Sequence, residues 1–238
     1  FDTAEGWGDV MSDYRFLRNT FMHEMGHGFG LGHVDPLDHT KLMEAFLNTN
    51  FDGPQDDDIR GGMRNYGDDA ENNDNANTAT DLGTLNNGTV TLTNRSTDSS
   101  GDNDWYRFTI TQPLSLAATL TPVGSTYLVG PSGGTTVSTN TLAINNLNFS
   151  VYAANGTTVL ASGNTAAAGL PESITGLTLN TLGNYYLRVQ NASGSTNNVQ
   201  RYTLAFTLSG GCTGITITGQ PVSLVRCEQF NATFTVTA

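Results

Sequence analysis

The stretch DWYRFTIT, residues 104–111, decides the fold expected for most of this chain, because its apolar and polar residues alternate. A period of two places successive side chains on opposite faces of a β-strand, so that one face meets a core. Similar strand-like stretches recur between Gly- and Asn-containing turns, at 89–93, 114–123, 147–154, 184–191 and 201–209. Short strands at this spacing predict an antiparallel β-sandwich over residues 68–209.

Aromatic and aliphatic residues in two of these stretches are expected to fill the sandwich core, because such side chains bury large apolar areas. The residues predicted to face inward are Trp105, Tyr106, Phe108, Tyr185, Tyr186 and Leu187.

The chain as a whole is acidic. It has 238 residues, with 10 Lys and Arg against 22 Asp and Glu, and a formal net charge of −12. This balance argues against nucleic acid and against an anionic membrane surface as partners. No apolar run approaches the length that spans a bilayer. Carboxylates are also the natural ligands of calcium.

The composition changes near residue 68. Residues 1–67 hold all four histidines and the only lysine, whereas the run 68–81 is polar and has no core-forming pattern. We therefore predict domains over residues 1–67, 68–209 and 210–238. The first is expected to be mostly helical, with one helix within 14–31 and another within 54–67.

Three of the four histidines lie in HEMGHGFGLGH, residues 23–33. His23 and His27 are four residues apart, so on a helix both imidazoles project from one face. Gly30 lets the chain leave the helix, and the turn then brings His33 round as a third ligand. Three imidazoles leave one tetrahedral position of a zinc ion open to water, which is the catalytic arrangement. The alternatives are three histidines that merely pack and a zinc site kept only for folding.

Glu24 follows the first histidine directly and is the candidate catalytic base. Zinc lowers the pKa of a bound water to about 7, and a neighbouring carboxylate accepts the proton that this water releases. The reaction that these groups suit is hydrolysis of an amide, most simply a peptide bond.

The spacing HExxHxxGxxH resembles that of the metzincin metalloproteases. Leu42-Met43 resembles their Met-turn, which implies that Met43 supports the site from beneath the metal. The run 55–67, QDDDIRGGMRNYG, resembles the C-terminal helix of the matrixin branch. The resemblance implies an α-helical C-terminal part of an α+β catalytic domain at residues 1–67, and it places the N-terminal sheet of that domain before Phe1. Val34 stands where matrixins usually have Ser, which leaves the branch open.

The first residues, FDTAEGW, resemble the end of the last sheet strand in that branch. There an Asp and a Glu bind structural calcium, so Asp2 and Glu5 are implied as calcium ligands. Two solvated surface acids are the alternative.

Residues after the boundary resemble a second family, the bacterial pre-peptidase C-terminal domain. The resemblance rests on ENNDNANTATDLG (71–83), SGDNDWYRFTI (100–110), LNFSVYAANGTTVLASG (147–163) and GNYYLRVQNASG (183–194). It implies a jelly-roll-like sandwich appended to a secreted protease. Some members bind calcium through acids near the start of the domain and in the DxDW strand, so Asp102 and Asp104 are candidate ligands. Turn residues before a strand are an equally strong interpretation.

The tail, residues 212–238, resembles the first strands of a bacterial immunoglobulin-like domain. It holds the only two cysteines, Cys212 and Cys227. A bond between them, or a bond from Cys227 to a cysteine beyond Ala238, is chemically reasonable in an extracellular setting.

These features predict a secreted, multidomain zinc endopeptidase that acts on protein or peptide substrates. In the alternative, the chain is an extracellular binding or adhesive protein with a residual metal site. The sandwich is then the surface that contacts matrix or glycan.

Overall fold

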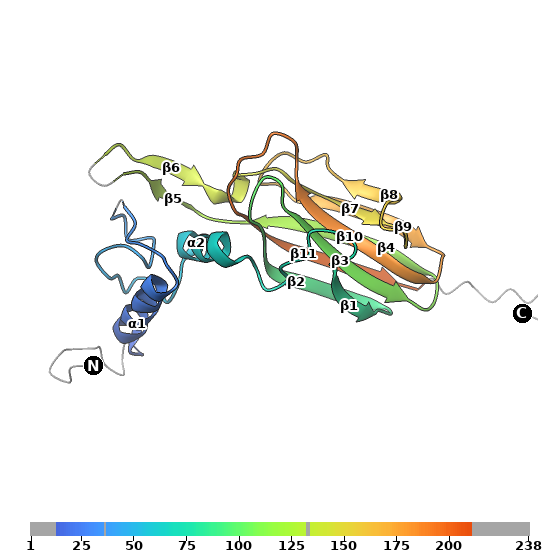
Figure 1. The fold of residues 1–238 in the computed structure, drawn as a ribbon, viewed down its shortest axis with the longest axis horizontal. Coiled ribbons are helices and arrows are strands. Elements are labelled where there is room, and N and C mark those ends of the chain that lie inside the picture. Colours follow the sequence, from blue (N-terminus) through green and yellow to red (C-terminus); the bar gives the residue numbers. More distant parts are fainter. Residues whose placement is uncertain (1–12, 36, 132–133, 211–238) are drawn as a thin grey trace, which may run out of the picture.

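The structure is a computed structural model that describes residues 13–35, 37–131 and 134–210 (Figure 1). Its two α-helices, α1 (Arg15–Gly28) and α2 (Asp56–Tyr66), come first. The strands follow: β1 (Thr80–Thr84), β2 (Gly88–Thr97), β3 (Asn103–Ile110), β4 (Leu114–Val123), β5 (Thr126–Val129), β6 (Val137–Asn140), β7 (Leu147–Tyr152), β8 (Val159–Gly163), β9 (Glu172–Leu179), β10 (Gly183–Asn191) and β11 (Gln200–Ser209). A short 3-10 helix, η2 (Thr141–Ala143), follows β6.

Strands dominate the described residues, and this contradicts the predicted fold class, in which an α-helical catalytic part precedes a separate sandwich. Among the described residues between the two helices, the only strand-like pairing is one isolated β-bridge, Val34 with Glu44. Backbone N–H groups of this segment are satisfied by buried carboxylates instead of helical carbonyls. Glu44 accepts hydrogen bonds from the N–H groups of residues 39–41, and Asp58 accepts those of residues 42 and 43.

Two sheets form the sandwich. One has the strand order β1-β3-β10-β7-β8 and the other β2-β11-β4-β9, while β5 and β6 form a separate two-stranded hairpin. Every pairing is antiparallel except β1 with β3, which is parallel. All six strands predicted from sequence are present, whereas β1, β5, β6, β8 and β9 were not anticipated.

The core between the two sheets follows the period-two pattern. In β3, Tyr106, Phe108 and Ile110 are buried in it, and β4 and β11 contribute alternate residues from the other sheet. The prediction was wrong for Trp105 and Tyr186, which lie on the opposite face of the sheet in a separate cluster. Successive side chains of a strand point to opposite faces, so Trp105 cannot share a face with its neighbour.

The two helices end where their glycines allow. α1 ends at Gly28 and the chain turns at Gly30, whose φ is +81°. α2 begins at Asp56, two residues after Pro54, because Gln55 caps it: its side chain and that of Asp58 form a reciprocal capping box. Gly67, with φ +73°, ends α2 as expected.

The predicted domain boundaries stay predictions. Asp2, Glu5 and the tail with Cys212 and Cys227 lie outside the described residues. Within the described ranges, no helix is long and apolar enough to cross a membrane.

Candidate metal sites

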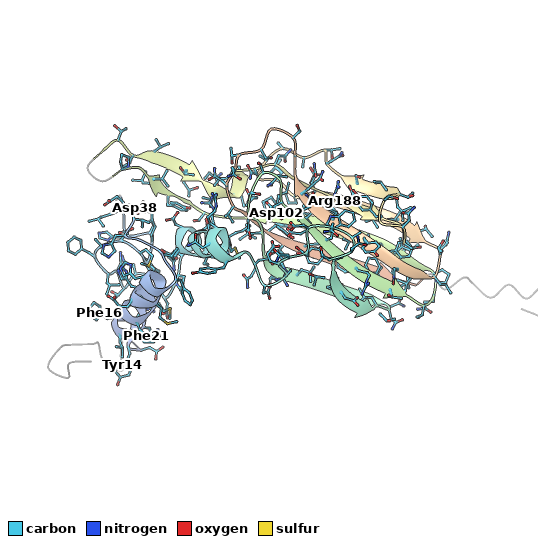
Figure 2. All side chains as sticks on the ribbon, in the orientation of Figure 1. Tyr14, Phe16, Phe21, Asp38, Asp102 and Arg188 are labelled. Carbon is cyan, nitrogen blue, oxygen red and sulfur yellow. The ribbon has the colours of Figure 1, made fainter. Side chains whose placement is uncertain are left out.

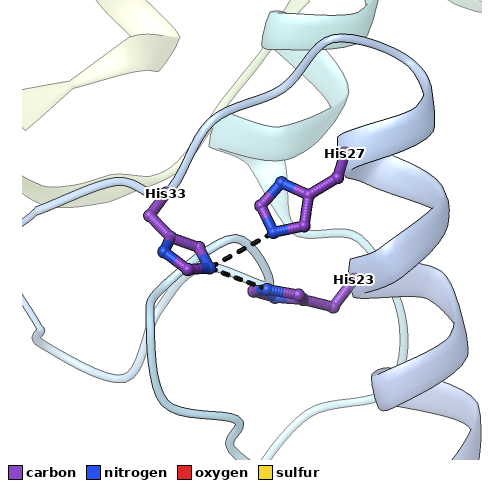
Figure 3. A group of neighbouring side chains, drawn as sticks. All are labelled: His23, His27 and His33. Carbon is purple, nitrogen blue, oxygen red and sulfur yellow. Dashed lines mark hydrogen bonds between the residues drawn. The ribbon is translucent and has the colours of Figure 1, made fainter.

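The structure brings His23, His27 and His33 together around one point (Figure 3). The Nε2 atom of His33 lies 3.1 Å from that of His23 and 3.2 Å from that of His27. The first two imidazoles project from successive turns of α1, and the third comes from the loop after Gly30. Four-residue spacing on a helix places the first two imidazoles on one face, and the glycine turn lets the third approach them.

Second contacts fix which ring nitrogens face that point. The Nδ1 atoms of His23 and His27 lie 2.8 Å and 2.9 Å from the backbone carbonyl oxygens of Leu42 and Leu31. A carbonyl oxygen only accepts, so each Nδ1 carries the hydrogen. In the neutral rings the Nε2 atoms then hold lone pairs and are ready to bind a metal.

This donor set fits zinc. Tetrahedral zinc with bonds of about 2.0 to 2.1 Å places two ligand nitrogens about 3.3 Å apart, close to the two distances observed. Two imidazole nitrogens this close repel each other through their lone pairs unless a cation or a proton lies between them. A single hydrogen on His33 Nε2 can point at His23 or at His27, but not at both. The identity of zinc as the cation stays a prediction.

The triad is open to solvent on one side. His23 is buried, whereas His27 and His33 are exposed. Glu24 follows His23 on α1 and is exposed as well. A metal held here would be accessible to water.

Met43 lies beneath the helix turn that carries the first two histidines. Its side chain is 1 % exposed. A Cβ added at Gly26 would lie 2.4 Å from the Met43 sulfur, so this glycine gives the methionine its place against α1. Met43 thus supports the turn between His23 and His27 by packing. Phe46, three residues after Met43, is 69 % exposed and does not pack in a core.

The loop between the third histidine and Met43 is organised by charged residues that the sequence analysis missed. Glu44 and Lys41 are buried, and their charged ends lie 3.6 Å apart. Lys41 also pairs with Asp38. The fourth histidine, His39, is 62 % exposed in its side chain and faces Glu44 instead of the triad. The one sequence signal for this network was that the chain's only lysine stands here.

A second group of possible metal ligands lies just after α2. Carboxylate oxygens of Glu71, Asp74 and Asp102 lie within 4.8 Å of one another. They line a cavity of about 440 Å³ together with Asp98. Burial, and then the charge of Asp102, raise the pKa of Glu71 to about 7. These acids repel one another, and an oxygen-binding cation such as calcium suits such a group.

Two residues in this part of the chain carry unsatisfied polar atoms. Oε1 of Glu71 has no hydrogen-bond partner among the described residues, and neither have the side-chain polar atoms of Asn73, which is fully buried. Buried polar atoms without partners are costly. Of these atoms, the carboxylate and amide oxygens are of the type that an oxygen-binding cation accepts as ligands.

The structure separates the two acids predicted as calcium ligands. Asp102 belongs to the acidic group, but Asp104 does not. Asp104 is fully buried, and one of its oxygens accepts a hydrogen bond of 2.7 Å from the Tyr202 hydroxyl. Glu71 and Asp74 were missed as individual residues, although both lie in the polar run 68–81 that was taken only as a boundary.

The described residues thus form a β-sandwich preceded by a two-helix segment with a three-histidine cluster. No family model matches the chain, and no curated protein matches it.

Two solved structures are similar over part of the chain. The pre-peptidase C-terminal domain of a collagenase from Bacillus anthracis has 15 % identity and a TM-score of 0.32, and the match covers 55 % of this chain and 94 % of that one. PliG of Aeromonas hydrophila, a periplasmic inhibitor of g-type lysozyme, has 14 % identity and a TM-score of 0.34, with 55 % and 97 % covered. The first is a domain of the kind that the motifs after residue 70 resemble. Neither comparison assigns a catalytic activity to this chain.

Proposed function

We propose that this chain is part of a secreted zinc-dependent peptidase, in which His23, His27 and His33 hold the metal and Glu24 is the general base. The observation that carries the proposal is the convergence of three Nε2 atoms on one solvent-accessible point. A zinc ion bound there supplies an acidic water and polarises a carbonyl group.

The residues of this chain supply the rest of the chemistry. The carbonyls of Leu42 and Leu31 hold two imidazoles in the tautomer that leaves Nε2 unprotonated. The carboxylate of Glu24 takes a proton from water and passes it to the leaving amine. An exposed site with three protein ligands suits catalysis better than structural zinc, which usually takes four protein ligands.

The test compares the wild-type chain with Glu24→Gln, which keeps the size of the side chain and removes the base. Bound zinc is measured by elemental analysis, and cleavage is measured on denatured gelatin with and without a chelator. We expect one zinc per chain in both proteins. Chelator-sensitive cleavage should occur in the wild type and fall by about 10²- to 10⁴-fold in Glu24→Gln.

A second candidate is an extracellular or periplasmic binding protein whose metal site is residual. It is favoured by the predominance of β-sheet, because the proposed catalytic residues occupy only one helix and the loop that follows it. Zinc bound by the wild type without any cleavage would favour this candidate over the peptidase.

We further propose that the acidic group of Glu71, Asp74 and Asp102 binds calcium. The close carboxylates and the unsatisfied Oε1 of Glu71 support this. Calcium should raise the unfolding temperature, because a ligand that binds only the folded state stabilises it. The same shift should be absent in Asp74→Asn and retained in Asp81→Asn, whose carboxylate pairs with Arg107 instead. An equal shift in both variants would reject the site.

A further inference from the structure

Helix α2 carries several polar contacts between the histidine segment and the sandwich. Arg60 and Arg64 donate hydrogen bonds of 3.0 Å and 2.8 Å to the backbone carbonyls of Val199 and Asn197. Another nitrogen of Arg60 donates to the Tyr127 hydroxyl at 2.8 Å. In Figure 1, α2 lies between α1 and the sandwich, and the β5–β6 hairpin extends over this region.

Asp56, the first residue of α2, makes a well-buried contact of this set. One of its oxygens accepts a hydrogen bond of 2.7 Å from Arg201 in β11, and the other accepts one from the Thr141 hydroxyl. The side chains of Asp56 and Arg201 are only 7 % and 11 % exposed. Removing one partner of such a pair leaves a buried charge uncompensated, so the two elements are held together tightly.

The same helix holds the loop beneath the histidines. Asp58 accepts hydrogen bonds of 2.8 Å and 2.9 Å from the N–H groups of Leu42 and Met43. The Leu42 carbonyl accepts from His23, and the Met43 carbonyl accepts from Val34, which directly follows the third histidine. Two hydrogen-bonded steps therefore connect α2 with the imidazole of His23 and with the backbone directly after His33.

The hairpin makes a second connection. The Leu128 N–H in β5 donates a hydrogen bond of 3.0 Å to Asp38, which lies in the loop after the third histidine. Figure 2 shows Asp38 beside this hairpin. Asp38 also pairs with the buried Lys41, and Lys41 lies 3.6 Å from the Glu44 carboxylate that holds the N–H groups of residues 39–41.

We propose that the β-sandwich is a positioning element of the histidine site. Arg201 and Thr141 act through Asp56, and Leu128 acts through Asp38. Together they hold α2 and the loop 34–44 in the conformation that brings the three imidazoles together. One test of this inference, the zinc affinity, rests on the proposed metal function. The other test, amide hydrogen exchange, is made on metal-free protein.

The experiment uses the full chain with Arg201→Met, which keeps much of the side-chain length and removes the charge. Arg107→Met is the matched control, because Arg107 makes an ion pair of 2.7 Å with Asp81 on the surface of the sandwich. Amide hydrogen exchange is first measured in metal-free protein. We expect exchange in residues 34–44 and 56–66 to rise about tenfold in Arg201→Met and to stay unchanged in the control.

Zinc affinity is then measured by competition with a chromogenic chelator. Arg201→Met should weaken it by about tenfold, as is typical when an outer contact of a metal site is lost. Arg201→Lys should restore most of the affinity, since only one guanidinium nitrogen contacts Asp56. If Arg201→Met does not fold, Thr141→Val removes a neutral partner of the same carboxylate and should raise exchange in the same two segments.

The outcomes separate the two proposals. Unchanged exchange and unchanged zinc affinity in Arg201→Met overturn the positioning role and leave the metal site standing. Exchange that rises equally in the core strand 114–123 also overturns it, because the effect is then global. Faster exchange in Arg201→Met that is confined to residues 34–44 and 56–66 supports the positioning role. If the wild type also binds no zinc, the metal function is rejected while the positioning role stands.

Discussion

His23 and Leu42 are 19 residues apart in sequence and are joined by a hydrogen bond of 2.8 Å from the imidazole Nδ1 to the backbone carbonyl. This bond fixes the tautomer of the imidazole and aims Nε2 at the other two histidines. It also ties helix α1 to the turn that contains Met43. A contact of this kind orients a metal ligand and makes it a better donor.

Replacing one exposed histidine of the triad should weaken metal binding strongly without unfolding the chain. We expect His27→Ala to weaken zinc binding by at least about 100-fold, because two imidazoles remain and the loss of an outer contact alone costs 10- to 100-fold. His39→Ala is the control, since His39 faces Glu44 outside the triad. Zinc content and affinity check this. Equal losses in both variants would contradict a three-histidine site.

Asp58→Asn should loosen the loop under the histidines. The carboxylate accepts three backbone N–H groups, from Leu42, Met43 and Gln55, and it is 6 % exposed. An amide cannot accept all three, so the free energy of unfolding should fall by about 1 to 3 kcal/mol, measured by denaturant titration. Asp81→Asn, in an exposed surface pair, should change it by less than about 1 kcal/mol. Equal effects of the two changes would argue against a special role for Asp58.

Tyr202→Phe should destabilise the sandwich by about 1 to 3 kcal/mol, because it removes a hydrogen bond to a buried acid. The Tyr202 hydroxyl donates to Asp104 at 2.7 Å and lies 2.8 Å from the hydroxyl of Tyr106. Tyr66→Phe removes an equivalent hydroxyl from a side chain that is 65 % exposed, and should have little effect. Denaturant titration of both variants measures the difference. An unchanged free energy of unfolding in Tyr202→Phe would show that Asp104 needs no partner.

The acidic group should make the metal-free protein less stable as the pH rises. The pKa of Glu71, raised by burial and by Asp102 from 4.5 to about 7, means that the folded state holds this proton more tightly than the unfolded state does. Stability should therefore fall between about pH 4.5 and pH 7 and level off above, because the unfolded chain releases the proton first.

Unfolding temperatures measured across that pH range, with a chelator present, check this expectation. Glu71→Gln should reduce the slope, and the slope that remains is expected from Asp98, whose pKa is raised by burial to about 6. Calcium should reduce the slope in the wild type by taking the place of the proton. Asp81→Asn should leave the slope unchanged, because Arg107 lowers the pKa of Asp81 instead. An unchanged slope in Glu71→Gln would assign it to another group.

The strands and the histidine triad were predictable because their signals are local. Alternation placed Tyr106 and Phe108 in the core, and the spacing of His23 and His27 placed two imidazoles on one helical face. Prediction from sequence failed for Trp105, because adjacent residues of one strand were assigned to the same face. It also failed where buried polar residues hold a loop that has no regular structure. Glu44 and Asp58 look like ordinary surface acids in sequence, because nothing local reveals that three N–H groups will converge on each.

The sequence by itself determined six of the β-strands, the helix that carries His23 and His27, and the glycine turn that returns His33, because each depends on backbone periodicity or on freedom at one residue. Only the tertiary structure decided that the first segment is not mainly helical and that Asp102 joins Glu71 and Asp74 while Asp104 pairs with Tyr202. It also decided that Arg201 reaches Asp56 across 145 residues. These contacts join distant parts of the chain, so they exist only once the sheets and helices have packed.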